Sequence, residues 1–149
     1  MEKYFANYNQ ALALKELGFD EPCFAGYRDS EWIGTGGPNS RYFHAQLFSN
    51  HQFDDDQKEY CSAPLKSQVF EWFREKHNLV IEPCVPFQRT YQTEDDYFEI
   101  LEFGYRIFEF DQFRGGRRNT IEWDGCENKL EETSESACID KLIEIVKNK

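Results

Sequence analysis

The densest positive charge in the chain is the run Arg114-Gly115-Gly116-Arg117-Arg118, and acidic stretches flank it on both sides, at residues 94–111 and 122–135. Three guanidiniums at the tip of a hairpin could bind an anion, because each presents several donors in a planar fork. The same run also fits a solvated tip whose arginines pair with neighbouring carboxylates. The sequence alone supports both interpretations.

A second anion candidate is the loop Gly34-Thr35-Gly36-Gly37. Backbone amides in such a loop could cradle a phosphate, which makes Gly36 and Gly37 candidate contacts. The loop lacks the Lys-Ser/Thr ending of a P-loop, and no clear helix follows it. An ordinary turn is the competing interpretation.

Metal and nucleophile chemistry find little support in the spacing of residues. His44, His51 and His77 show no H-x-x-x-H or H-E-x-x-H pattern, and the acidic run 54–56 fits a solvated loop. Glu99 and Glu102 fall in an expected strand, where a separation of three puts them on opposite faces, so they make a poor acid/base pair. We therefore expect no metal, no cofactor and no enzymatic activity.

The cysteines are five in number, widely spaced and without a C-x-x-C pair. They are Cys23, Cys61, Cys84, Cys126 and Cys138. This pattern argues against a disulfide scaffold or a zinc ribbon. We expect most of them to be reduced and to pack as small buried apolar side chains.

Charge and length narrow the class of protein. The 149 residues fit a single domain spanning 1–149, and the net charge of -11 would repel a nucleic-acid backbone. It would suit a protein partner with a basic surface. Phe, Tyr and Trp number 25 against 21 Leu, Ile and Val, so aromatic rings must supply much of the core or of a contact surface. No secretory signal or membrane span is evident, which predicts a cytoplasmic protein.

The N-terminal half is expected to contain two helices and a few short strands. The first helix covers 9–17, with Asn7 or Asn9 as its cap and Gly18 in the left-handed position after it, followed by a closing contact from Phe19. Strands are predicted at 23–28 and 32–35, and apolar pairs at 42–43 and 47–48 rejoin the sheet. The second helix covers 63–77, capped by Ser62 and ended by Asn78.

The C-terminal half is expected to be rich in strands. The prediction places strands at 79–85, 97–103, 105–110 and 121–123. Pro83 and Pro86 put the first of these at an edge or a bulge, and Gly104 is read as a bend or bulge. Thr133 or Ser134 caps a last helix with a wide apolar stripe.

These elements predict an α+β protein, an antiparallel sheet with about three helices, two of them packed on one face. The order from residue 63 onward resembles a double-stranded-RNA-binding domain in topology only. The acidic balance, and the lack of a basic cluster opening the last helix, argue against that function.

Three blocks of the chain resemble a family of small, uncharacterised proteins encoded by phages and prophages of gut anaerobic bacteria. The blocks run from Leu14 to Phe24, from Ser62 to Lys76, and from Lys141 to Val146 together with Cys138. The resemblance implies that the gene belongs to a phage or prophage. It does not assign an activity, because the family has no assigned chemistry. Residues 25–60 and 84–129 lie outside it, so a function peculiar to this protein is expected there.

The leading hypothesis is a non-enzymatic phage or prophage accessory protein that binds a host or defence protein through an acidic, aromatic surface. The candidate partner contacts are Tyr91, Asp95, Asp96, Tyr97 and Phe113. The alternative is a protein that binds or sequesters a nucleotide-like small molecule, with Arg114, Arg117 and Arg118, or the loop at Gly36 and Gly37, on its phosphates. A hydrolase built from scattered His and Asp residues is the third hypothesis.

Overall fold

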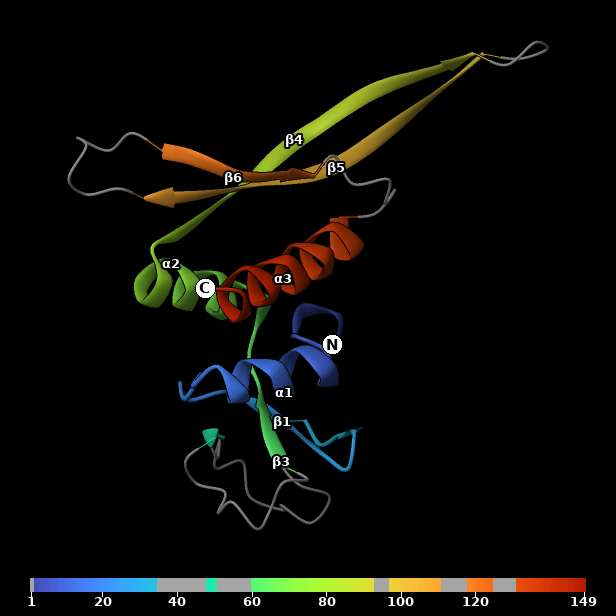
Figure 1. Ribbon diagram of the computed structural model, residues 1–149. Coiled ribbons are helices and arrows are strands. Elements are labelled where there is room, and N and C mark those ends of the chain that lie inside the picture. The colour runs from blue at the N-terminus through green and yellow to red at the C-terminus, as the bar shows by residue number, and fades with distance from the viewer. Residues whose placement is uncertain (1, 35–47, 51–59, 93–96, 111–117, 125–130) are drawn as a thin grey trace. The chain divides into compact units, whose positions relative to one another are not determined.

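The computed structural model of the chain describes residues 2–34, 48–50, 60–92, 97–110, 118–124 and 131–149 (Figure 1). Of residues 83–92, 97–103, 110, 118–124 and 131–133, only the backbone is described. The elements are a 3₁₀ turn η1 (Glu2–Tyr4), helices α1 (Tyr8–Glu16), α2 (Lys66–His77) and α3 (Glu131–Lys147), and strands β1 (Ala25–Arg28), β2 (Glu31–Trp32), β3 (Tyr60–Ala63), β4 (Leu79–Gln92), β5 (Tyr97–Phe110) and β6 (Arg118–Asp124).

The chain divides into two compact units. Unit 1 comprises Met1–Val69 and Ile143–Lys149, and unit 2 comprises Phe70–Leu142. The prediction of a single domain over 1–149 stays a prediction. None of the described helices is long and apolar enough to cross a membrane.

In unit 1, side chains and backbone close both ends of α1. Asn7 and Gln10 form a capping box: the Asn7 side chain accepts from the Gln10 amide over 3.0 Å, and the Gln10 side chain accepts from the Asn7 amide over 3.1 Å. At the other end Gly18 has a φ of +87°, and the buried Phe19 donates its amide to the Leu14 carbonyl. The Gly18 amide also donates to the Lys15 carbonyl, and the two bonds together form a Schellman motif. The predicted Asn7 cap and Gly18 ending are confirmed.

The sheet of unit 1 is antiparallel and has the strand order β2-β1-β3. Cys23, two residues before β1, forms an isolated antiparallel bridge with Phe48, in which the two residues exchange amide–carbonyl bonds of 2.7 and 2.8 Å. Of the apolar pairs predicted to rejoin the sheet, Phe48 makes only this isolated bridge, and Tyr42, Phe43 and Leu47 lie outside the described residues.

The core of unit 1 combines small residues with rings. Phe5, Tyr27 and Trp32 lie edge to face, with centroids 4.8 Å apart for Phe5–Trp32 and 5.4 Å for Tyr27–Trp32. The Tyr27 hydroxyl donates to the Ala6 carbonyl over 2.9 Å, so the one polar atom of this buried ring is paired. Small buried side chains complete the cluster at Ala11, Ala25, Cys61 and Ala63.

The prediction that Ser62 caps α2 is wrong, because Ser62 belongs to β3 and pairs with Gly26. The helix begins at Lys66, and the Gln68 side chain accepts from the Leu65 amide over 3.0 Å, the second half of a capping box. The β propensity of the Tyr60–Ala63 run outweighs the cap signal of Ser62. Asn78 ends the helix as predicted, with a φ of +56°.

Unit 2 contains the antiparallel sheet β4-β5-β6. Its first strand runs to Gln92, past the predicted end at residue 85. β4 is an edge strand, and its register shifts between Cys84 and Phe87, so the prediction of an edge or bulge from the two prolines is confirmed. The strand β5 is continuous through Gly104, which pairs with Cys84 beside this bulge. The extra residue of this bulge therefore lies in β4, and β5 is not interrupted at Gly104.

Helix α3 begins at Glu131, so Thr133 and Ser134 lie inside it and the prediction that either caps it is wrong. Its predicted apolar stripe is found, since Cys138, Ile139 and Leu142 are buried. In the rest of unit 2 the buried side chains come from α2, the start of β4 and the second half of β5, and are Trp72, Phe73, Leu79, Tyr105, Ile107 and Phe108.

The protein is therefore of the α+β class, as predicted, with two antiparallel sheets in place of one. In Figure 1 helices α2 and α3 lie on the same side of the β4-β5-β6 sheet.

Candidate functional site

The described thiols of unit 1 are poorly suited to nucleophilic chemistry. Burial raises the pKa of Cys23 to about 12, an effect that Ser62 opposes and Glu21 reinforces. Burial likewise raises the pKa of Cys61 to about 11, with Lys15 opposing it. Since the thiolate is the nucleophile, less than about one such thiol in a thousand would be reactive at neutral pH. Both are free and buried, as is Cys138, which confirms the packing role predicted for them.

Asn50 is a buried polar residue that the sequence analysis missed. Its side-chain amide donates to the Phe19 carbonyl over 2.6 Å, and its side-chain oxygen accepts from the Ser62 amide over 2.9 Å. It thereby joins the end of the α1 segment to β3. Both bonds are buried and pair the Asn50 side chain with backbone groups. Asn50 is therefore a structural residue, and no local sequence pattern marks it.

The turn between β1 and β2 is the clearest strained point of the described backbone. Asp29 and Ser30 both have positive φ, +49° and +67°, while Arg28 pairs with Glu31. Two central residues with positive φ make a type I′ turn, which matches the twist of the flanking strands. The Ser30 hydroxyl donates to the Asp29 carbonyl. A two-residue Asp-Ser link between two strands is the sequence signal that could have predicted it.

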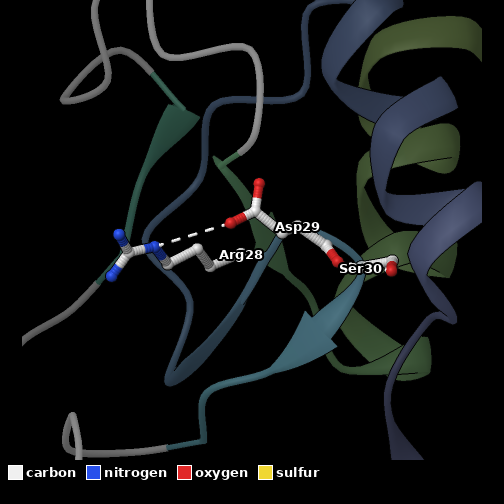
Figure 2. A network of polar contacts seen from close by, with 3 residues as sticks. All are labelled: Arg28, Asp29 and Ser30. Carbon is white, nitrogen blue, oxygen red and sulfur yellow. Dashed lines mark hydrogen bonds and ion pairs between the residues drawn. The ribbon is translucent and has the colours of Figure 1, made fainter.

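Polar and aromatic side chains gather beside this turn. Figure 2 shows the Arg28 and Asp29 side chains directed toward each other, with Nε 3.8 Å from the carboxylate. The guanidinium also lies 5.2 Å from the centre of the Tyr60 ring, and Lys15 Nζ donates to the Tyr60 carbonyl over 2.8 Å. Both members of the ion pair are more than half exposed. This cluster therefore forms a small polar surface, and its ion pair contributes about 0–1 kcal/mol to stability.

The residues predicted to bind an anion are divided between the two units. Gly36 and Gly37 belong to the sequence range of unit 1, whereas Arg114, Arg117 and Arg118 belong to that of unit 2. Of these five, Arg118 alone is among the described residues: it opens β6 and pairs with Phe110. In the sequence, Arg114 and Arg117 fall between the consecutive antiparallel strands β5 and β6, and both lie outside the described residues.

The predicted partner contacts belong to two different hairpins. Tyr91 pairs with Phe98 and Tyr97 pairs with Gln92, at the closed end of the β4–β5 hairpin. Asp95 and Asp96 lie outside the described residues, in the four-residue connection between those strands. Phe113 is also outside them, in the connection that follows Phe110 at the opposite end of β5.

The length of β5 separates these two groups. Its 14 residues, at about 3.3 Å each, put its ends more than about 40 Å apart. Tyr91 and Tyr97 lie at one end of the strand pair, and the prediction that Phe113 belongs to the same contact surface stays a prediction, because Phe113 lies outside the described residues. The connectivity of two consecutive hairpins, which the strand predictions already contained, could have revealed the separation.

The β4–β5 hairpin has a two-stranded arm. β6 pairs with β5 from Tyr105 to Phe110, whereas β4 pairs with it from Tyr97 to Glu109. Among the described residues, those from 97 to 104 are thus paired on one side only. Figure 1 shows this part of β4 and β5 running on beyond β6. We call residues 87–92 and 97–104 the arm.

Metal ligands do not gather in the described part of the chain. No group of three His, Cys, Asp or Glu residues there could hold an ion. Of the three histidines, His44 and His51 lie outside the described residues, and His77 packs against the rings of Trp72 and Phe73, at 4.8 and 5.6 Å between centroids.

Comparison with known proteins finds no matching family, no matching curated protein and no matching solved structure. Function must therefore be argued from the charge, the strand pairing and the chemistry of the side chains.

Proposed function

We propose that this protein is a non-enzymatic accessory protein, encoded by a phage or prophage, that binds a host or defence protein with a basic surface. The observation that carries the proposal is the net charge of -11. Complementary charge accelerates the encounter with a basic partner and disfavours acidic competitors. The setting of this interaction is the cytoplasm of the host cell.

The closed end of the β4–β5 hairpin is the proposed contact surface. Tyr91 and Tyr97 flank its connection, in which Glu94, Asp95 and Asp96 stand next to one another in the sequence. Tyrosine is enriched at protein interfaces, because its ring supplies apolar area and its hydroxyl supplies a hydrogen bond. Rings beside carboxylates suit a partner surface that carries lysine or arginine.

Affinity capture tests this function. The tagged full chain is incubated with lysate of a gut anaerobe at about 50 and about 200 mM salt, around the range where screening of surface charge becomes strong. The expected result is a stoichiometric basic protein, bound more strongly at the lower salt concentration. Recovery of no stoichiometric protein at either concentration would refute the proposal.

A second candidate is binding of a nucleotide-like signal at the β5–β6 hairpin. It is favoured by the position of Arg118, which opens β6 directly after the connection that contains Arg114 and Arg117. These three arginines fall within five residues of the sequence, and guanidiniums suit phosphate. It predicts a rise in melting temperature with one member of a nucleotide panel, and loss of that rise in Arg117→Ala. An unchanged melting temperature across the panel counts against it.

A further inference from the structure

Among the described residues, the arm is a two-stranded extension of the three-stranded sheet. Near the helices, β5 lies between β4 and β6, but from residue 97 to residue 104 it pairs with β4 alone among the described residues. Two-stranded ribbons are marginally stable in water, and a third strand normally supplies the missing stability. The outer edge of this segment is therefore a place where a further strand would be favourable.

The two outer edges of the arm differ in their fitness to receive a strand. On the β4 side, Pro83, Pro86 and the register shift between Cys84 and Phe87 lie just before the arm, which leaves a free edge of six residues, Phe87–Gln92, that contains Arg89 and no Asp or Glu. Proline and bulges are common devices that protect a sheet edge from pairing. The β5 edge contains neither over its eight residues, which span about 27 Å. It also continues the line of β6, whose last residue, Asp124, pairs with Tyr105.

The charge of the β5 edge indicates whether the added strand would come from a second copy of this chain or from a different partner. Residues 97–104 contain Glu99 and Glu102 and no lysine or arginine, and the whole chain has a net charge of -11. Pairing two copies along this edge would bring like charges together, which is unfavourable in a sheet. An extended segment rich in lysine or arginine would find opposite charge.

We propose that the outer edge of β5, from Tyr97 to Gly104, binds an extended basic peptide segment as an added strand. Main-chain hydrogen bonds would supply affinity, and alternate side chains would supply specificity. This inference rests on the proposed function: it states how the basic protein partner would be held.

The probe for a first experiment is a random dodecapeptide library displayed on phage and selected on the full chain. Enriched peptides are synthesised, and amide hydrogen exchange of the protein is measured with and without them. The expected result is enrichment of positively charged peptides without central proline, and a roughly tenfold or greater slowing of exchange at every second residue of 97–104. Neutral or acidic enriched peptides, slowing confined to other residues, or self-association through this edge would overturn the proposal.

Proline substitutions at neighbouring positions provide a matched pair. Consecutive residues of a strand direct their amides to opposite sides, so of Ile100→Pro and Leu101→Pro one removes a bond to β4 and the other removes a donor from the open edge. Hydrogen exchange of the free variants identifies which is which. The edge variant should retain the β4–β5 ladder and lose at least tenfold in peptide affinity. Unchanged affinity in that variant would also overturn the proposal.

The same measurements separate the two proposals. If the partner captured from lysate slows exchange only outside 97–104, the binding function stands and strand addition is wrong. If capture recovers no partner, the binding function fails, whatever the peptides do.

Discussion

Raising the pH from 8 to 10 should destabilise the protein through two buried thiols. Burial raises the pKa of Cys23 from its ordinary value of 9.0 to about 12 and that of Cys61 from 9.0 to about 11. The unfolded chain therefore loses these protons first. Their contribution to stability is fully present below about pH 9 and is lost as the pH rises toward 11 to 12.

The size of the effect follows from the same values. One pH unit above the unfolded pKa corresponds to about 1.4 kcal/mol for each thiol, so at pH 10 the two together remove about 3 kcal/mol. This is a large part of the roughly 5–15 kcal/mol that stabilises a typical domain. Tyr27 adds to the loss above pH 10, because burial, then Glu2 and Cys61, raise its pKa to about 12.

Urea unfolding under reducing conditions, followed by tryptophan fluorescence at pH 7, 8, 9 and 10, measures this loss. The control is the double variant Cys23→Ala and Cys61→Ala, which should start from a lower stability and lose about 3 kcal/mol less between pH 8 and 10. Equal losses in the two proteins would refute the assignment of these thiols as buried and protonated.

Three further substitutions test the fold of unit 1, each by urea unfolding. Asn50→Ala should lower the free energy of unfolding by about 2–4 kcal/mol, because two buried backbone groups lose their bonds to the Asn50 side chain. The control Asn148→Ala, at an exposed position, should lower it by less than about 0.5 kcal/mol. Similar losses in the two variants would contradict the structural role of Asn50. Gly18→Ala should cost about 1 kcal/mol, since alanine is strained at a φ of +87°, and an unchanged midpoint would exclude the Schellman ending. Ser30→Gly should raise stability by about 0.5 kcal/mol at the type I′ turn, and a loss would contradict the turn assignment.

The parts of the fold that were predictable are those with local causes. Asn7, Gly18 and Asn78 mark helix ends through their own backbone chemistry, and the structure confirms each of them. Pro83 and Pro86 marked an edge strand with a bulge for the same reason, because proline lacks the amide that a central strand needs.

The errors arose where pairing partners distant in sequence decide the outcome. Ser62 has the chemistry of a helix cap, yet its backbone pairs with Gly26 in β3 and with the Asn50 side chain. The helix therefore begins four residues later. The division into two sheets was missed for the same reason, since strand signals reveal that a segment pairs but not with which neighbour.

The candidate site was predictable in composition and not in geometry. The rings and carboxylates around Tyr91 and Tyr97 were recognised, and the β4–β5 register places these two residues beside one connection. Phe113 follows the other end of β5 in the sequence, and it lies outside the described residues. The open edge of residues 97–104 depends on where β6 ends.

The central claim is that the protein acts by binding a basic partner at the closed end of the β4–β5 hairpin. Its most direct test is affinity capture with the double variant Tyr91→Ala and Tyr97→Ala, beside a control variant, Tyr4→Ala and Phe24→Ala, that removes two exposed rings of unit 1. We predict that the control retains the partner and that the hairpin variant, folded by circular dichroism, loses at least tenfold in affinity. Equal retention by both variants would contradict the claim.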